Sequence, residues 1–152
     1  MKNKKYTLVD SDFKLTISGV KVFRIKSLVK TKYVDENTLG GYIESEKNLN
    51  QDCNAWVYGN AQVYGNAQVY GNAQVHGDAQ VHGNALVKKT PIVLSGFKHS
   101  ITCTGTHILI GCEGHTVSHW KKNIVSIGHK HSYSKDEIKF VINFLKIVYM
   151  VF

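Results

Sequence analysis

Residues 54–89 decide the fold: they read NAWVYG, NAQVYG, NAQVYG, NAQVHG, DAQVHG and NALVKK, six hexapeptides without a gap. Ala fills the second position of every hexapeptide and Val the fourth, and Gly closes the first five. An even period keeps the alternating side chains of a strand on the same faces in every repeat, whereas it would spread the valines around a helix. Gly followed by Asn or Asp accepts a positive φ. Each hexapeptide is therefore expected to be a short strand that ends at a corner.

This pattern resembles that of left-handed parallel β-helix proteins, in which three hexapeptides make one triangular coil. The resemblance implies that residues three hexapeptides apart stack at about 4.8 Å, the spacing of neighbouring strands. Val57 is then expected over Val75, with Val and Ala in the interior. Outward rings should form a surface ladder that could stack a base or dock a protein, with the first two tyrosines over the two histidines: Tyr58, Tyr64, Tyr70, His76 and His82.

Two coils cannot bury their own ends, so caps are required. Upstream, Ile43 and Leu49 continue the phase of the repeat alanines and predict an imperfect first coil within residues 40–49. Residues 15–25 predict a β-hairpin with strands at 15–17 and 23–25 and its turn at Ser18 and Gly19. Downstream, residues 91–96, 99–103 and 107–111 remain strand-like.

Two helices are expected at the end of the chain. Thr116 is a suitable N-cap for the first helix, which Gly128 should end. Ser134 and Glu137 form a capping box that opens a second helix running to the C-terminus. That helix is apolar on most of its circumference, so it should seal the array or join subunits. The residues expected to serve oligomerisation are Ile138, Val141, Phe144, Leu145, Val148 and Phe152.

The expected fold is mainly β, a short left-handed parallel β-helix with an N-terminal β-hairpin cap and two C-terminal α-helices. We expect one compact domain with three parts: an N-terminal β cap (1–40), the hexapeptide-repeat β-helix (41–113) and a helical cap or oligomerisation segment (114–152). A chain of 152 residues can bury roughly two thirds of its unfolded surface and needs no disulfide.

The amino-acid composition limits the class of protein and the cellular compartment in which it would be found. With 43% hydrophobic and 20% charged residues, the chain is neither disordered nor collagen-like. Its three cysteines, an odd number at wide spacing, fit a reducing compartment, so we expect a cytoplasmic protein. The first residues lack the apolar core of a targeting segment. The most apolar stretch, residues 140–152, is shorter than the roughly 20 residues of a membrane span, so no membrane partner is expected.

Charge is concentrated at the two ends of the chain. Lys and Arg minus Asp and Glu give 19 − 11 = +8 overall, made up of 9 − 4 in residues 1–40, 3 − 4 in 41–89 and 7 − 3 in 90–152. The basic N-terminal cap is a candidate surface for RNA or another polyanion, through Lys21, Arg24, Lys26, Lys30 and Lys32. Arg24 and Lys26 should share one outward face. The alternative stays open, because a Lys-rich chain with a single Arg is also what an AT-rich genome produces.

Beyond the repeats, the segments 22–25, 39–49 and 110–116 resemble a group of phage and prophage proteins in which a variable hexapeptide array lies between fixed caps. The final helix differs, since it is usually acidic in that group and is apolar here. The resemblance implies the fold and a phage context, hence the cytoplasm of a bacterial host cell, but no enzymatic activity. Small phage accessory proteins often inhibit host defence by binding, as anti-CRISPR proteins do.

The sequence contains no Ser-His-Asp pattern, Walker loop or paired acidic motif, so no catalytic residue, metal or cofactor is expected. His76 and His82 are one hexapeptide apart and should lie on neighbouring faces, unlike a zinc-ligand pair. A second cluster could hold a metal or could be a buried Cys beside polar histidines of the cap: Cys103, His107, Cys112, His115 and His119.

The sequence thus favours a non-enzymatic phage or prophage binding protein that inhibits a host defence system. Its partner would be a host defence protein or ribonucleoprotein, such as a CRISPR effector with guide RNA, and a homo-oligomer could form through the last helix. The alternative is a degenerate hexapeptide acyltransferase that uses CoA, although the array has no inserted loop and only two coils to hold a pantetheine arm.

Overall fold

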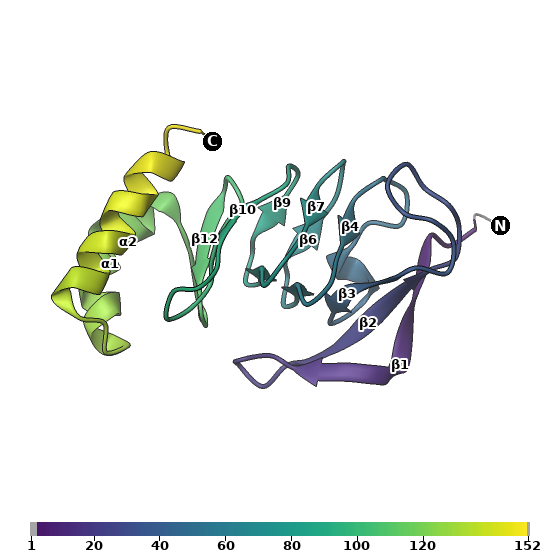
Figure 1. Ribbon diagram of the computed structural model, residues 1–152, viewed down its shortest axis with the longest axis horizontal. Helices are drawn as coiled ribbons and strands as arrows, with labels where there is room; N and C mark the ends of the chain where they lie inside the picture. The colour runs from purple at the N-terminus through teal and green to yellow at the C-terminus, as the bar shows by residue number, and fades with distance from the viewer. Residues whose placement is uncertain (1–2, 152) are drawn as a thin grey trace. The chain divides into compact units, whose positions relative to one another are not determined.

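The computed structural model describes residues 3–151 and is mainly β with two C-terminal helices (Figure 1). Contacts divide the chain into two compact units, Met1–Gly114 and His115–Phe152, and each is treated by itself below.

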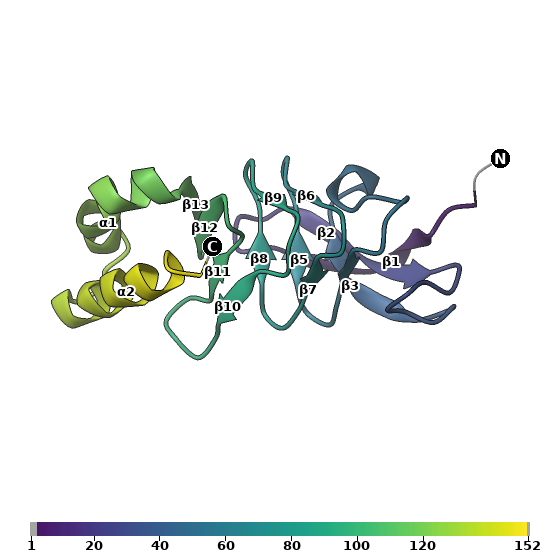
Figure 2. The ribbon, with the colours of Figure 1, turned by 90° about the horizontal axis from the view of Figure 1, so that it is seen from above.

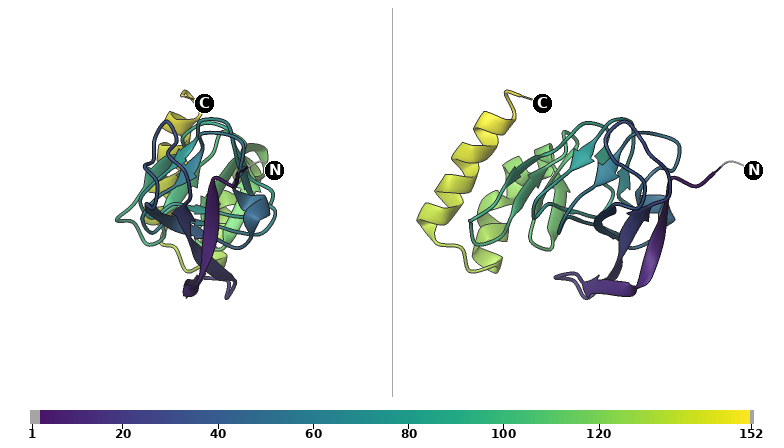
Figure 3. Two further views of the ribbon diagram at one scale, coloured as in Figure 1. Left: turned by 90° about the vertical axis from the view of Figure 1, so that its right-hand side faces the viewer. Right: turned by 45° about the vertical axis from the view of Figure 1, so that its right-hand side comes forward.

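Each hexapeptide forms one short strand, and strands three hexapeptides apart pair in parallel. The strands are β4 (Trp56–Val57), β5 (Gln62–Val63), β6 (Gln68–Val69), β7 (Gln74–Val75), β8 (Gln80–Val81) and β9 (Leu86–Val87). In the ladders β4 pairs with β7, β5 with β8 and β6 with β9, so Val57 lies beside Val75 as expected. The successive coils overlie one another when seen along the array (Figure 3, left).

The interior of the coils is made of the repeated apolar side chains. All six alanines and all six valines of the hexapeptides have no exposed surface. At the corners, the five repeat glycines have φ between 55° and 67°. Gly65 shows why glycine is needed there, because an added Cβ would lie 3.3 Å from the backbone nitrogen of Gly83 in the next coil. Burial of small side chains and positive φ at the corners together allow strands three hexapeptides apart to pair in parallel.

The first coil departs from the expected phase. Ile43 pairs with Val63 and Leu49 with Val69, so these residues share the phase of the repeat valines and not of the alanines. The spacing here exceeds three hexapeptides because the chain makes an extra turn after Leu49, where the Asp52 backbone N–H donates to Asn50 Oδ1 at 2.7 Å. A short 3-10 helix (Glu46–Asn48) lies in this coil.

An N-terminal hairpin joins the array through strand β3 (Leu39–Ile43). Its strands are β1 (Tyr6–Leu15) and β2 (Lys21–Ser27), and the sheet runs β1-β2-β3-β5-β8. The turn lies at the expected place, with Gly19 at φ 78°. The first strand was expected at residues 15–17, but β1 is longer and ends at Leu15. It also contains a bulge between Val9 and Phe13.

Lys5 and Tyr6 close the N-terminal end of the array. The buried Lys5 ammonium donates to three carbonyl oxygens of the first turn, those of Asn50 (2.6 Å), Cys53 (3.0 Å) and Ala55 (2.8 Å). The Tyr6 hydroxyl donates to the Leu49 carbonyl at 2.7 Å. Burial lowers the pKa of Lys5 and raises that of Tyr6. Carbonyl groups that have no further strand to pair with thus find donors in side chains.

The other end of the array is covered by an antiparallel sheet with strand order β10-β11-β12-β13 (Figure 2). Its strands are β10 (Ile92–Leu94), β11 (Ile101–Cys103), β12 (His107–Ile110) and β13 (Glu113–Thr116). Threonine hydroxyls form hydrogen bonds with backbone groups of the last coil, at the positions where the backbone of a further strand would otherwise pair. Thr90 and Thr102 accept from the backbone N–H groups of Gln74 (3.1 Å) and Gln80 (3.2 Å), and Thr106 donates to the Leu86 carbonyl (3.3 Å).

The second unit is a pair of helices, α1 (Val117–Lys130) and α2 (Lys135–Val148). Thr116 caps α1 by accepting from the His119 N–H, and the capping box at the start of α2 is present, as expected. The expectation that Gly128 ends the first helix is wrong, because α1 continues to Lys130. Gly128 instead allows close packing of α2, since a Cβ there would lie 2.6 Å from Ile138 Cγ1.

Candidate binding surfaces

The predicted ladder of rings forms, but half of it is not on the surface. Tyr58 stacks on His76 with ring centroids 4.4 Å apart and planes at 10°, and His76 is exposed. Tyr64 stacks on His82 at 5.0 Å, yet these two side chains are only 4% and 6% exposed. Tyr70, the fifth member, is half-buried.

Two segments outside the array bury the second stack. Tyr64 packs in one cluster with Val22 and Tyr42, beneath the hairpin. His82 donates from Nε2 to the Gly111 carbonyl at 3.1 Å. The expectation of a surface ladder is therefore wrong for Tyr64 and His82, because the sequence of the repeat does not indicate which outward faces the caps cover. Of the other stack, His76 is exposed to a partner, whereas Tyr58 is half-buried.

Arg24 of the basic cap is engaged within the chain. Its guanidinium donates from Nε to Asp12 Oδ2 at 2.7 Å, from Nη1 to the Gly40 carbonyl at 2.8 Å and from Nη2 to the Tyr42 hydroxyl. It also lies over the Tyr42 ring, 4.5 Å from its centroid. Arg24 thus fastens the hairpin to β3 and does not present a free cation beside Lys26.

The lysines of the basic cap differ in their surroundings. Lys21 and Lys32 are exposed and lie over aromatic rings, with Lys21 Nζ 3.9 Å from the Phe13 centroid and Lys32 Nζ 5.1 Å from that of Tyr33. Lys26 is half-buried. Lys30 is exposed and forms an ion pair with Asp35 at 3.6 Å, which is worth little at the surface.

The sequence did not reveal an apolar patch that lies on the hairpin. It consists of Phe13, Leu15 and Ile17, which are 49%, 65% and 53% exposed, together with Phe23 and Lys21. Phe13 and Phe23 are register partners across the hairpin, with ring centroids 6.4 Å apart. The alternation of Phe13, Leu15 and Ile17 could have revealed it, but alternation alone does not distinguish a core face from an exposed one.

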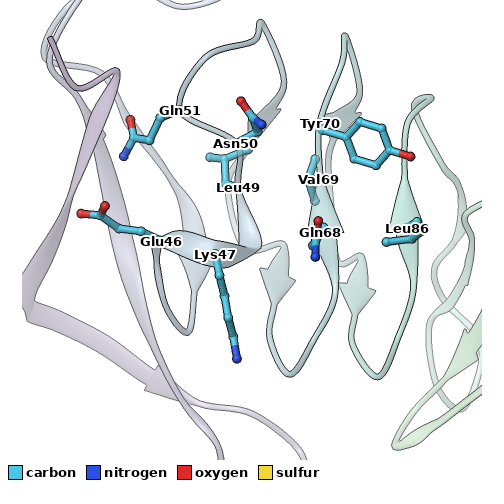
Figure 4. A pocket seen from close by; sticks show the side chains of 9 residues that line it. All are labelled: Glu46, Lys47, Leu49, Asn50, Gln51, Gln68, Val69, Tyr70 and Leu86. Carbon is cyan, nitrogen blue, oxygen red and sulfur yellow. The ribbon is translucent and has the colours of Figure 1, made fainter. Parts of the chain in front are cut away.

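A groove lies beside the 3-10 helix, above the outward face of β6 and β9, and has a volume of about 460 Å³ (Figure 4). Its polar side chains do not converge: Glu46 and Lys47 point in different directions in Figure 4. Glu46 is already paired with Lys4 at 2.7 Å, and Gln51 Oε1 accepts from the Lys5 backbone at 2.8 Å. This groove therefore offers no assembled set of groups for a ligand.

The Cys and His residues near residues 103–119 fall into separate environments. Cys103 is buried, and burial raises the pKa of its thiol to about 12, so it is not a ready metal ligand. Cys112 is exposed. The rings of His115 and His119 stack with centroids 4.1 Å apart, an arrangement that turns ring faces, not nitrogens, toward each other. His107 Nδ1 lies 3.0 Å from the Thr106 hydroxyl.

Most residues expected to serve oligomerisation are buried within the single chain: Ile138, Val141, Leu145 and Val148. Phe144 is half-buried, and Phe152 lies outside the described residues. A self-association surface on α2 would therefore have to use other side chains, of which Phe140 and Ile147 are 46% and 64% exposed. The sequence did not indicate which apolar side chains of α2 stay exposed, because the helix is apolar on most of its circumference.

The helical unit contains a second feature that the sequence analysis missed, an apolar groove between α1 and α2 of about 490 Å³. We call it the helix groove. It is lined by Trp120, Lys121, Ile124, Val125, Ile142, Leu145, Lys146 and Tyr149.

The chain was compared with protein-family models and with curated proteins, and none of them matches it. Within residues 3–151, no helix combines the length and the apolar character needed to cross a membrane.

Proposed function

We propose that this chain is a non-catalytic binding protein whose scaffold is a short left-handed parallel β-helix. The parallel ladders at intervals of three hexapeptides, the positive φ at the repeat glycines and the closed Val and Ala interior support this architecture. A scaffold of this kind is rigid, because each coil hydrogen-bonds to the next and its core side chains have little rotamer freedom. The recognition surface would be carried by the caps and by the exposed outward rings.

The observation that carries the proposal is the pairing of exposed cations with aromatic rings on the N-terminal cap. Lys21 lies beside Phe13 and Phe23, and Lys32 beside Tyr33. Proteins that bind single-stranded nucleic acid combine cations for the phosphates with rings on which bases stack. The cap also carries the largest regional excess of positive charge, 9 − 4 = +5.

We infer that the partner is an RNA-containing host complex. The resemblance to phage and prophage proteins supplies the biological setting, in which the chain inhibits a host defence system, with a CRISPR effector and its guide RNA as the example. The protein would then act by covering an RNA or protein surface of the effector, not by chemistry.

The test measures the affinity for a single-stranded RNA oligonucleotide as a function of salt concentration. One variant replaces Lys21, Lys26, Lys30 and Lys32 with Glu, and Arg24 is left intact because it holds the hairpin to β3. The matched control replaces four exposed lysines elsewhere in the same unit, Lys47, Lys88, Lys89 and Lys98, with Glu.

We expect the cap variant to bind at least about tenfold more weakly and to lose about 0.7 units of salt slope for each phosphate contact removed. The control should change the affinity much less. Equal losses in the two variants would show that only net charge matters, and no loss in either would contradict the proposal.

The acyltransferase alternative makes an opposite prediction. Addition of CoA or acetyl-CoA should leave the melting temperature of a binding protein unchanged, whereas a concentration-dependent rise would favour the enzyme.

A further inference from the structure

The helix groove lies entirely within the second unit and has the character of a small-molecule site. Its volume of about 490 Å³ lies within the range of roughly 300–1,000 Å³ that is usual for ligand pockets. Six of its eight lining residues are apolar or aromatic, and the buried Trp120 is among them. A site of this composition binds mainly through apolar contact, with a small number of polar groups to fix orientation.

The length of the groove limits what it can hold. On α2 and its C-cap residue the lining residues run from Ile142 to Tyr149, which at 1.5 Å per residue is about 10 Å, or two helical turns. That is short for a docked amphipathic helix, which uses anchors over more than two turns. It suits the tail of one medium-chain molecule.

The charge around the groove indicates which head group the ligand should carry. Lys121 and Lys146 are the only charged residues among its lining residues, and Lys121 Nζ lies 4.9 Å from the Tyr149 ring centroid. The acidic residues of the unit, Asp136 and Glu137, lie in the first turn of α2, at the other end of that helix. Lys minus acidic residues over 115–152 gives 6 − 2 = +4.

This charge argues against a second copy of the chain in the groove, because two such units would bring like charges together. We propose that the helix groove binds a small amphiphile with one anionic head group, a monomeric medium-chain carboxylate. Its tail lies against Trp120, Ile142 and Leu145, and its carboxylate lies between Lys121 and Lys146. The proposal does not depend on RNA binding, which concerns the other unit.

The experiment uses the full chain and dodecanoate below its micelle concentration, followed by the two indole N–H signals in a ¹H–¹⁵N correlation spectrum. Trp120 lines the groove, and Trp56 lies in the core of the first unit and serves as an internal control. We expect the Trp120 signal to shift in a saturable manner and the Trp56 signal to stay in place. The variant Trp120→Phe assigns the signals.

Two charge-reversal variants test the head group. Lys121→Glu with Lys146→Glu should raise the dissociation constant of dodecanoate at least about tenfold, since the carboxylate then meets two like charges. Lys122→Glu with Lys139→Glu makes the same charge change at exposed positions that do not line the groove and should change it less than about twofold. Dodecanol, which lacks the charge, should bind more weakly than dodecanoate.

Results of three kinds would overturn the proposal. The first is a Trp120 signal that does not respond to dodecanoate, or equal losses in the two pairs of lysine variants. The second is a Trp120 signal that shifts with protein concentration alone, which would place a second copy in the groove. The third is binding to phosphatidylglycerol vesicles without a response to monomeric dodecanoate, which would assign the groove to a lipid surface.

Discussion

Val69 lies at the centre of the array and has no exposed surface. It pairs with Val87 in the next coil and with Leu49 in the preceding one, so apolar side chains lie on both sides along the stack. Its neighbour Gln68 is in the same strand but points outward and is exposed. These adjacent residues offer a matched pair for testing which side chains face inward.

We expect Val69→Asp to lower the free energy of unfolding by about 3–5 kcal/mol, because it places a carboxylate among apolar side chains with no partner. Gln68→Asp should cost no more than about 1 kcal/mol, since its carboxylate stays in water. Chemical denaturation followed by circular dichroism measures both. Equal stability of the two variants would contradict the assigned faces.

At the scale of single residues, the sequence predicted the features that recur in every hexapeptide and missed the contacts with segments outside the array. The inward valines and alanines and the stacks of Tyr58 on His76 and Tyr64 on His82 follow from the period of six. The burial of Tyr64 and His82 does not, because it depends on the hairpin and on the loop at Gly111, which are distant in sequence. Likewise the contact of Arg24 with Asp12 depends on the bulge in β1, which no local pattern indicates.

The element that ends the array is β11, and its Thr102 replaces the backbone of a missing coil. Thr102 has no exposed surface, and its Oγ1 accepts from the Gln80 N–H at 3.2 Å. Thr90 does the same for Gln74 at 3.1 Å, but Thr90 is exposed. Water can therefore replace the hydroxyl at Thr90 but not at Thr102.

We expect Thr102→Val to cost about 1–3 kcal/mol, because it leaves a backbone N–H without an acceptor in the interior. Thr90→Val should cost less than about 1 kcal/mol. Thermal or denaturant unfolding of the two isosteric variants checks this. A larger loss for Thr90→Val would show that the side chains of β11 do not cap the array.

Elements were easier to predict than their boundaries and partners. The caps of both helices were found from Thr116 and from the box at Ser134 and Glu137, since capping is local chemistry. The end of α1 was not, because Gly128 serves the packing of Ile138 and not the termination of the helix. The phase of Ile43 and Leu49 was missed because a small insertion in one turn is enough to shift it.

At the scale of the whole molecule, the two units carry different surfaces. The first carries the hexapeptide array, the stack of the half-buried Tyr58 on the exposed His76 and the cationic N-terminal cap. The second carries the helix groove with its two lysines. The class of fold follows from the repeat, whereas the partner does not, since exposed lysines serve any polyanion equally well. Binding measurements with matched charge variants are therefore needed for each unit.

The proposed β-helix has three hexapeptides in each coil, and disulfide formation tests this period most directly. Gln68 and Leu86 are exposed register partners three hexapeptides apart, whereas Gln68 and Gln80 are two hexapeptides apart and lie on strands of different ladders, β6 and β8. The background carries Cys53→Ser and Cys112→Ser. Cys103 stays in place, because it is buried and its pKa is raised to about 12.

Mass spectrometry after mild oxidation measures the fraction of each double variant that closes a disulfide within the chain. We predict that Gln68→Cys with Leu86→Cys closes, because register partners in neighbouring strands lie within the Cα separation of about 4.4–6.8 Å that a disulfide needs. Gln68→Cys with Gln80→Cys should stay reduced, although its shorter loop would close more readily in an unfolded chain. Closure of the Gln68 and Gln80 pair in preference to the Gln68 and Leu86 pair would contradict a coil of three hexapeptides.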